Sequence, residues 1–265
     1  MNKKYATRDL IAIIVQTGLL IAIAQVVKLI SSTYIYIAGA PAIRISFSGP
    51  FTGMPGILFG PLVGGIAGGL GDIIGYLLRP QGAYIPWFTV TAILGGVLTP
   101  IFWITFRKVN VKRLQTTCIV LFGAMGMLGI FNHIMVTFLP DNGYASYLLG
   151  LGKNKAFTTL GLEVTAAVGF LLLFVDYVMK KKLTANYVHD NFLKLLISVG
   201  ISGLIVTTLN TQILRIFIPA LSQKAFIAFW IPRVIEELFM SVYIAYMLSF
   251  LLHLYHKVFK PNRFM

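Results

Sequence analysis

Six ionisable side chains lie within or beside strongly apolar stretches of this sequence, where charges are costly. They are Arg44, Asp72, Glu163, Arg233, Glu236 and Glu237. In the core of a bilayer a charged side chain usually faces an internal cavity or pairs with an opposite charge. We therefore treat these residues as candidates for binding a polar ligand inside a membrane protein.

Arg233 has two alternative roles. Glu236 and Glu237 follow it by three and four residues, so all three side chains share one face of a helix. The arginine could simply neutralise these glutamates. Pro232 precedes it, and a proline within a helix leaves backbone groups free, which favours the alternative that Arg233 faces a ligand.

Asp72 lies in the segment "GGIAGGLGDIIG", where Gly64, Gly68, Gly71 and Gly75 recur every three or four residues. Small residues at this spacing allow two helices to approach closely, so we predict that the glycines form a packing surface. Asp72 either makes a hydrogen bond between helices or reaches a ligand. Its depth in the segment ranks it behind the other candidates.

An aromatic segment, "PQGAYIPWFTVTA" at 80–92, joins two apolar runs. It contains Tyr84, Trp87, Phe88 and Thr89. Aromatic residues commonly gather at the level of the lipid headgroups, which is one interpretation. The other is a lid whose aromatic faces stack on a flat ligand. Asn210, in an otherwise apolar run, is predicted to bond across helices or to the ligand.

The composition requires a membrane. Of the 265 residues, 57% are apolar and 11% are charged, which is too few to coat a soluble globule. The net charge of +14 does not indicate nucleic acid, because no soluble segment interleaves aromatic and basic residues. Cys118 is the single cysteine and the histidines are scattered, so we expect neither a metal nor a cofactor.

The basic residues predict the topology. Clusters occur near residues 3–8, 107–113, 180–182 and 257–263, and the positive-inside rule places all four in the cytoplasm. Eight apolar runs separate them, at about 9–30, 47–59, 61–79, 86–106, 114–139, 156–179, 190–218 and 224–256. We predict one multi-pass domain over 1–265, with both termini cytoplasmic and a helix break at Gly60–Pro61. The stretch before it, with Gly39 and Pro41, is predicted to be an outer loop.

An internal repeat is also indicated. The segment "FNHIMVTFLP" at 131–140 is similar to "LNTQILRIFIP" at 209–219, and "KAF" at 155 recurs at 224. Each copy precedes a long apolar run. We therefore interpret residues 108–189 as an inserted or duplicated helical hairpin.

Several motifs in order carry a family resemblance. "RISFSGPFTGMPGILFGPLVGGIAGGLGDIIGYLL", "AYIPWFTVTAILGG", "LNT" at 209 and "IPR" at 231 resemble the S-components of energy-coupling-factor vitamin transporters, most closely the folate-type branch. The resemblance covers 9–107 and 190–257. It departs from the family at Trp87, where a glycine is expected, and in the additional helices of 108–189.

The resemblance implies an all-α integral membrane fold, with a six-helix bundle plus the inserted hairpin and about eight spanning segments in the cell membrane. It implies a substrate-binding subunit, not an enzyme, that captures a folate-like vitamin. A transmembrane coupling protein and two cytoplasmic ATPases would be its partners. Small residues of the first helix, Gly18 and Ala22, would meet the coupling protein. This chain has no phosphate-binding GxxxxGK[ST] loop of its own.

The resemblance also suggests roles for the candidate residues. Tyr84, Trp87 or Phe88 would stack on a pterin ring. Arg233 or Arg44 would bind a glutamate-tail carboxylate or the ring oxygens. Thr89, Asn210 and Asp72 would supply further hydrogen bonds to the ligand.

Other classes of protein stay open. A self-contained secondary transporter fits the eight segments and the repeat. The vitamin could also differ from folate. An intramembrane protease is disfavoured, because "RVIEELF" has paired glutamates but Ser241 follows where an arginine is needed, and the next histidine is His253. A scaffold protein would leave the buried charges unexplained.

Overall fold

The computed structural model describes residues 3–37, 40–80, 82–150, 157–182, 186–218, 221 and 226–259. The chain divides into two compact units. One unit consists of Met1–Lys108 together with Asp190–Met265, and the other is Val109–His189. The division falls next to the boundaries of the segment that the sequence suggests is inserted.

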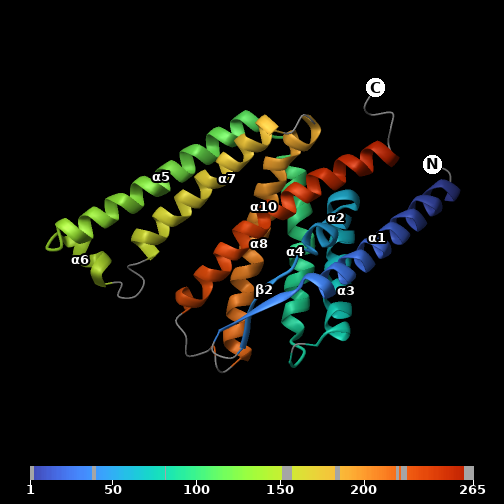
Figure 1. The fold of residues 1–265 in the computed structure, drawn as a ribbon, viewed down its shortest axis with the longest axis horizontal. Coiled ribbons are helices and arrows are strands. Elements are labelled where there is room, and N and C mark those ends of the chain that lie inside the picture. The colour runs from blue at the N-terminus through green and yellow to red at the C-terminus, as the bar shows by residue number, and fades with distance from the viewer. Residues whose placement is uncertain are drawn as a thin grey trace. The chain divides into compact units, whose positions relative to one another are not determined.

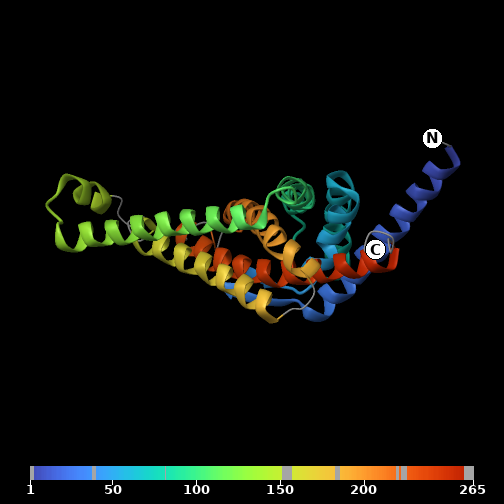
Figure 2. The ribbon, with the colours of Figure 1, turned by 90° about the horizontal axis from the view of Figure 1, so that it is seen from above.

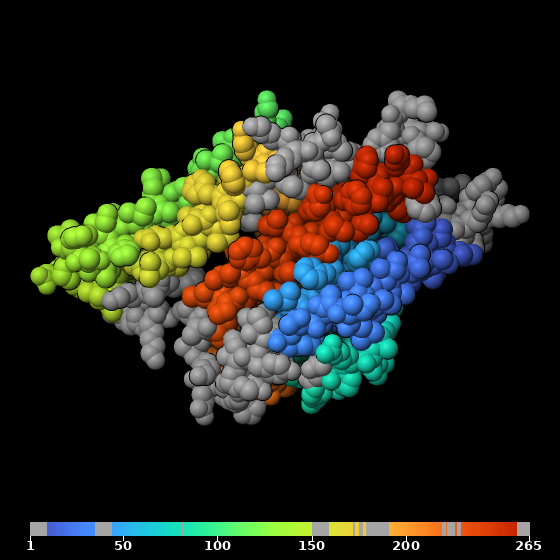
Figure 3. All heavy atoms as spheres, viewed as in Figure 1, coloured from blue at the N-terminus to red at the C-terminus, as the bar shows by residue number. Residues whose placement is uncertain are grey.

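The first unit is a bundle in which the described residues form six helices. These are α1 (Lys3–Ser31), α2 (Gly49–Phe59), α3 (Pro61–Leu78), α4 (Pro86–Phe106), α8 (Asn186–Phe217) and α10 (Phe226–Phe259). Figure 3 shows α10 and α1 running side by side with α2 between them. Their exposed side chains are largely apolar, as lipid contact requires.

Six helices of the described part of the chain are long and apolar enough to cross a membrane. They are α1, α3, α4, α8 and α10 of the first unit and α5 (Val111–Phe138) of the second. α2 has only 11 residues, fewer than a span normally needs. The predicted all-α integral membrane fold, a six-helix bundle with an additional hairpin, is confirmed.

The segment before α2 contains a small β-hairpin. β1 (Thr33–Ile37) pairs antiparallel with β2 (Ala40–Ile45), and Tyr34 lies opposite Arg44. The sequence predicts an outer loop here, so the strands refine that expectation. The alternating β-branched and aromatic residues of "TYIYI" are the pattern that favours a strand.

The predicted break at Gly60–Pro61 is confirmed. α2 ends at Phe59 and α3 begins at Pro61. Gly60 between them has φ of 99°, a left-handed conformation that glycine adopts without a steric penalty. Pro61 occupies the first turn of α3, where its missing amide hydrogen is not needed.

Glycines bring α3 and α4 into backbone contact, as the sequence predicts. Figure 1 shows the two helices side by side. A Cβ on Gly64 would overlap the carbonyl oxygen of Gly96, and one on Gly68 would overlap that of Ala92. Both glycines of α3 are buried. Their lack of a side chain is therefore what allows these helices to pack so closely.

The second unit is a helical hairpin of α5 and α7 (Leu162–Lys182), which lie alongside each other in Figure 2. Between them lie α6 (Gly143–Gly150) and a π-helical turn (Phe157–Gly161). Asn110 caps α5, because its side chain accepts a hydrogen bond from the Lys112 amide at 2.9 Å.

The α5–α7 hairpin of the second unit and the α8–α10 hairpin of the first unit share one kind of internal contact. In the second unit, Glu163 packs over Gly129 and pairs with His133 at 3.1 Å. In the first unit, Glu237 packs over Gly203 and accepts a hydrogen bond from Thr207 at 2.9 Å. Gly203 follows Gly129, Thr207 follows His133 and Glu237 follows Glu163, each by the same number of residues. The two hairpins thus repeat one arrangement of glycine, polar partner and carboxylate.

Candidate ligand-binding cavity

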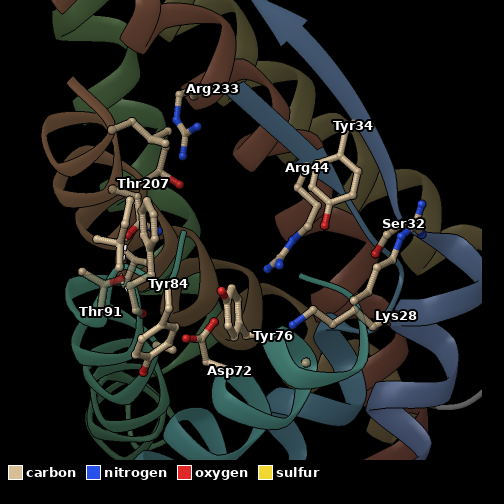
Figure 4. A pocket seen from close by; sticks show the side chains of 18 of the residues that line it. Lys28, Ser32, Tyr34, Arg44, Asp72, Tyr76, Tyr84, Thr91, Thr207 and Arg233 are labelled. Atoms are coloured by element: carbon tan, nitrogen blue, oxygen red, sulfur yellow. Dashed lines mark hydrogen bonds between the residues drawn. The ribbon is translucent and has the colours of Figure 1, made fainter. Parts of the chain in front are cut away.

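The first unit encloses a cavity of about 460 Å³, shown in Figure 4. Small-molecule sites typically measure about 300–1,000 Å³. Side chains from α1, β1, β2, α3, α4, α8 and α10 line it, and its charged residues are Lys28, Arg44, Asp72, Arg79, Arg233, Glu236 and Glu237. A second cavity of about 260 Å³ shares Gln25, Lys28 and Asp72 with the first. The bundle therefore holds a polar interior of ligand size.

One wall of the cavity is cationic. Lys28 of α1 and Arg44 of β2 extend toward the same space in Figure 4. Arg79, which follows α3, lies 5.8 Å from the centre of the Tyr34 ring in a cation–π contact. This contact joins the β-hairpin to the end of α3. The arrangement suits an anionic group on the ligand.

Asp72 faces the same space from the opposite side, close to Tyr76 and Tyr84 (Figure 4). The Thr89 hydroxyl donates a hydrogen bond to Asp72 Oδ2 at 2.8 Å. Because that hydroxyl has a single proton, the Tyr84 hydroxyl must be the donor in its own bond to Thr89. This chain of hydrogen bonds orients the Asp72 carboxylate through Oδ2.

An aromatic surface lies beside Asp72. The rings of Tyr76 and Tyr84 are 5.0 Å apart at an angle of 52°. The Tyr76 hydroxyl donates to the Gly82 carbonyl at 3.1 Å, which ties the α3–α4 connection to α3. Phe88 lines the cavity from the first turn of α4. A flat ring with hydrogen-bond donors at its edge could stack on these aromatic side chains and donate to the Asp72 carboxylate.

Arg233 and Asn210 also line the cavity, as the sequence predicts. The Arg233 guanidinium lies 5.5 Å from the centre of the Phe229 ring. Asn210 Oδ1 accepts a hydrogen bond from the Thr91 hydroxyl at 2.6 Å, which joins α8 to α4. Both interpretations of Asn210, a bond between helices and a place at the ligand site, are compatible with this position.

Trp87 is not among the residues that line this cavity. Phe88, Thr91 and Ala92 share the face of α4 that lines the cavity. Trp87 and Val90 lie on another face and are 55% and 51% exposed. The periodicity of the helix separates neighbours in sequence onto different faces, so Trp87 points outward. Thr89 is buried next to the cavity and acts on it through Asp72.

Glu163 lies in the second unit, where it pairs with His133, and so it is not part of this cavity. Gln25, Lys28 and Tyr76 line the cavity although the sequence does not single them out. Lys28 carried a signal, because it is a charge at the end of the apolar run 9–30. Among the described residues, no cluster of three or more His, Cys, Asp or Glu side chains is placed to bind a metal.

Comparisons with known proteins give two matches. A family model described as the S component of an ECF-type riboflavin transporter matches residues 10–179. The folate transporter FolT of Clostridium novyi (strain NT) is 44% identical over 73 residues, which are 28% of this chain and 42% of that protein. The alignment thus spans less than half the length of that relative. No solved structure matches the chain.

Proposed function

The chain belongs to the S-component family of ECF-type transporters, and from this premise we propose that it captures a folate-like vitamin at the outer face of the cell membrane. We propose that uptake is driven by ATP, with a transmembrane coupling protein and two cytoplasmic ATPase subunits as partners. The basic clusters support cytoplasmic termini, which puts the β-hairpin and the α3–α4 connection outside.

The observation that carries the choice of folate is the polarity of the cavity. Lys28 and Arg44 form a cationic wall, and Asp72 faces it beside Tyr76 and Tyr84. A pterin ring offers N–H donors to a carboxylate and a flat face to aromatic side chains. The glutamate tail of folate offers carboxylates to the cationic wall. The partial similarity to a folate transporter agrees with this choice.

Riboflavin is the second candidate, because the description of the matching family model names it. Its ring could stack on the same aromatic side chains, but the molecule is uncharged and offers no carboxylate to Lys28 and Arg44. Folate can therefore form charge-assisted hydrogen bonds with these two cations that riboflavin cannot form. The cationic wall therefore favours folate over riboflavin.

Isothermal titration calorimetry of the purified protein tests the choice of vitamin. We expect folate to bind and riboflavin to bind at least about tenfold more weakly, which corresponds to about 1.4 kcal/mol. Stronger binding of riboflavin would overturn the folate assignment and keep the family. Uptake by the chain alone in proteoliposomes, without ATPases, would favour a secondary transporter and overturn the proposed partnership.

The first helix offers a surface for the coupling protein. Gly18 and Ala22 are exposed on α1, and a Cβ on Gly18 would meet no atom within 4 Å. Small residues four apart allow a partner helix to approach closely. We expect Gly18→Leu to weaken co-purification with the coupling protein while folate binding, measured by calorimetry, is unchanged. Loss of folate binding, or intact association, would contradict this role of α1.

We further propose that residues 108–189 are a duplicated hairpin within a single membrane domain. The carboxylate contact that the two hairpins share supports this proposal. The family match includes α5 and most of α7 and ends before α8, whereas the sequence motifs predict a match over 9–107 and 190–257. If the two hairpins are related in sequence, the last part of the family model can align with either of them.

Deletion of the second unit should leave ligand binding intact. Every lining residue of the 460 Å³ cavity in the described part of the chain belongs to the first unit. The Lys194 ammonium donates to the Arg107 carbonyl at 3.0 Å, so the end of α4 and the start of α8 lie close enough for a short linker. We expect the shortened chain to keep its folate affinity within about threefold, because the deletion removes none of the described lining residues. Complete loss of binding in a folded, monodisperse sample would show that α5 and α7 contribute to the site.

A further inference from the structure

Two side chains of α1 reach the cavity across a gap in α3. The gap is formed by Gly71 and Gly75, which we call the glycine notch. A Cβ on Gly71 would lie 3.3 Å from Gln25 Nε2. A Cβ on Gly75 would overlap the Lys28 ammonium and lie 2.9 Å from Gln25 Oε1. Gln25 and Lys28 therefore occupy the space that side chains at these two positions would fill.

The two glycines of the notch contact a different helix from the one that Gly64 and Gly68 contact. Gly64 and Gly68 lie against the backbone of α4, whereas Gly71 and Gly75 lie against polar side chains of α1. Asp72 lies between the two notch glycines and faces the cavity. The notch thus brings an amide and an ammonium of α1 to the same cavity as the Asp72 carboxylate.

Gln25 is held with an unused acceptor. Its side chain is only 7% exposed, and Nε2 donates to the Gly71 carbonyl at 2.9 Å. That bond fixes the orientation of the amide, because a carbonyl can only accept. Oε1 is buried and has no hydrogen-bond partner among the described residues. A buried acceptor without a donor is unfavourable, so a ligand donor at this place would be stabilised.

We propose that Gln25 and Lys28 form a specificity pair that recognises an amide N–H next to a carboxylate. The N–H would donate to Gln25 Oε1, and the carboxylate would bind the Lys28 ammonium. Both atoms lie near one point, the position of a Cβ on Gly75, so one small group of the ligand can contact both. An N-acyl amino acid has this pattern of donor and acid.

This inference rests on the proposed function, because folate carries such a group where glutamate is linked to its benzoyl carbonyl. Pteroic acid has the same ring system and ends in a benzoate carboxylate. It lacks the glutamate and the amide N–H, and it serves as the matched ligand. Calorimetry on the full chain should show that the wild type prefers folate to pteroic acid by about 10- to 100-fold, the range expected for hydrogen bonds to charged groups.

Three variants test the pair itself. Gln25→Leu, Lys28→Met and Gly75→Ala should each lower the affinity for folate by about tenfold or more. The affinity for pteroic acid should change by less than about threefold in Gln25→Leu and Gly75→Ala, and in Lys28→Met it should fall by less than the affinity for folate, because pteroic acid has a carboxylate but no amide N–H. Lys28→Arg should keep most of the preference, because the positive charge remains. Gly200→Ala is the matched control, since a Cβ there would meet no atom within 4 Å.

The outcomes separate the inference from the proposed function. If the wild type binds neither folate nor pteroic acid, both fail. If it binds folate and the variants keep its full preference over pteroic acid, the specificity pair is wrong and the proposed function stands. An equal loss for both ligands, in variants with wild-type melting temperatures, would show a general packing role for α1 and would also overturn the pair.

Discussion

Replacing Gly96 with leucine should strongly destabilise the bundle. A Cβ on Gly96 would overlap the Gly64 carbonyl oxygen and lie 2.7 Å from its carbon and 3.1 Å from the Gly65 nitrogen. All three are backbone atoms, which cannot rotate away, so α3 and α4 must separate. Overpacking usually costs about 1–3 kcal/mol, and we expect this variant to reach at least the upper value.

Thermal unfolding in detergent measures the effect. A loss of about 3 kcal/mol corresponds to a fall in Tm on the order of 10 °C for a chain of this size. Gly200→Ala and Gly123→Ala are the controls, because a Cβ at either position would enter open space. An unchanged Tm in Gly96→Leu would mean that α3 and α4 do not make this close backbone contact.

Asp72→Asn should cause a large loss of folate binding with little change in stability. The amide keeps the size of the carboxylate and can still accept the hydrogen bond from Thr89. It removes the negative charge that pairs with ring N–H donors. Hydrogen bonds to charged groups contribute about 1.5–3 kcal/mol, so the affinity should fall about 10- to 100-fold.

Calorimetry with folate measures this loss, with Trp87→Ala as the control. Trp87 lies on the outward face of α4, so its removal should leave the affinity unchanged. Wild-type affinity in Asp72→Asn would remove Asp72 from the site. Loss of binding in Trp87→Ala would instead restore the aromatic lid that the sequence suggests.

The sequence predicts those structural features that depend on one segment of the chain alone. The scarcity of charge requires a membrane, and Gly60–Pro61 breaks the helix because of its own backbone chemistry. The glycines of α3 predict close packing without identifying the partner. Arg44, Asp72 and Arg233 are candidates because charge is costly in lipid, wherever the helices lie.

Other features depend on how segments far apart in sequence meet. Trp87 and Phe88 are neighbours, yet only the placement of α4 decides which one faces the cavity. Gln25 and Lys28 belong to a helix whose Gly18 and Ala22 suggest a partner surface. The charge of Lys28 at the end of the apolar run is a signal, but the sequence does not show that Gln25 and Lys28 face the same cavity as Asp72. The sequence ranks Asp72 behind the other candidates because it lies deep in its apolar segment, but the cavity reaches that depth.

The sequence by itself therefore determined that this is a helical membrane protein, where its helices break, and which charges need an explanation. These properties follow from the energy of placing each group in lipid or in a turn, which is local. The tertiary structure alone decided that Lys28 and Arg44 face Asp72 across one cavity, and that Gly71 and Gly75 admit side chains of α1. Those properties depend on the relative positions of α1, β2 and α3, and helix packing sets them through contacts between distant residues.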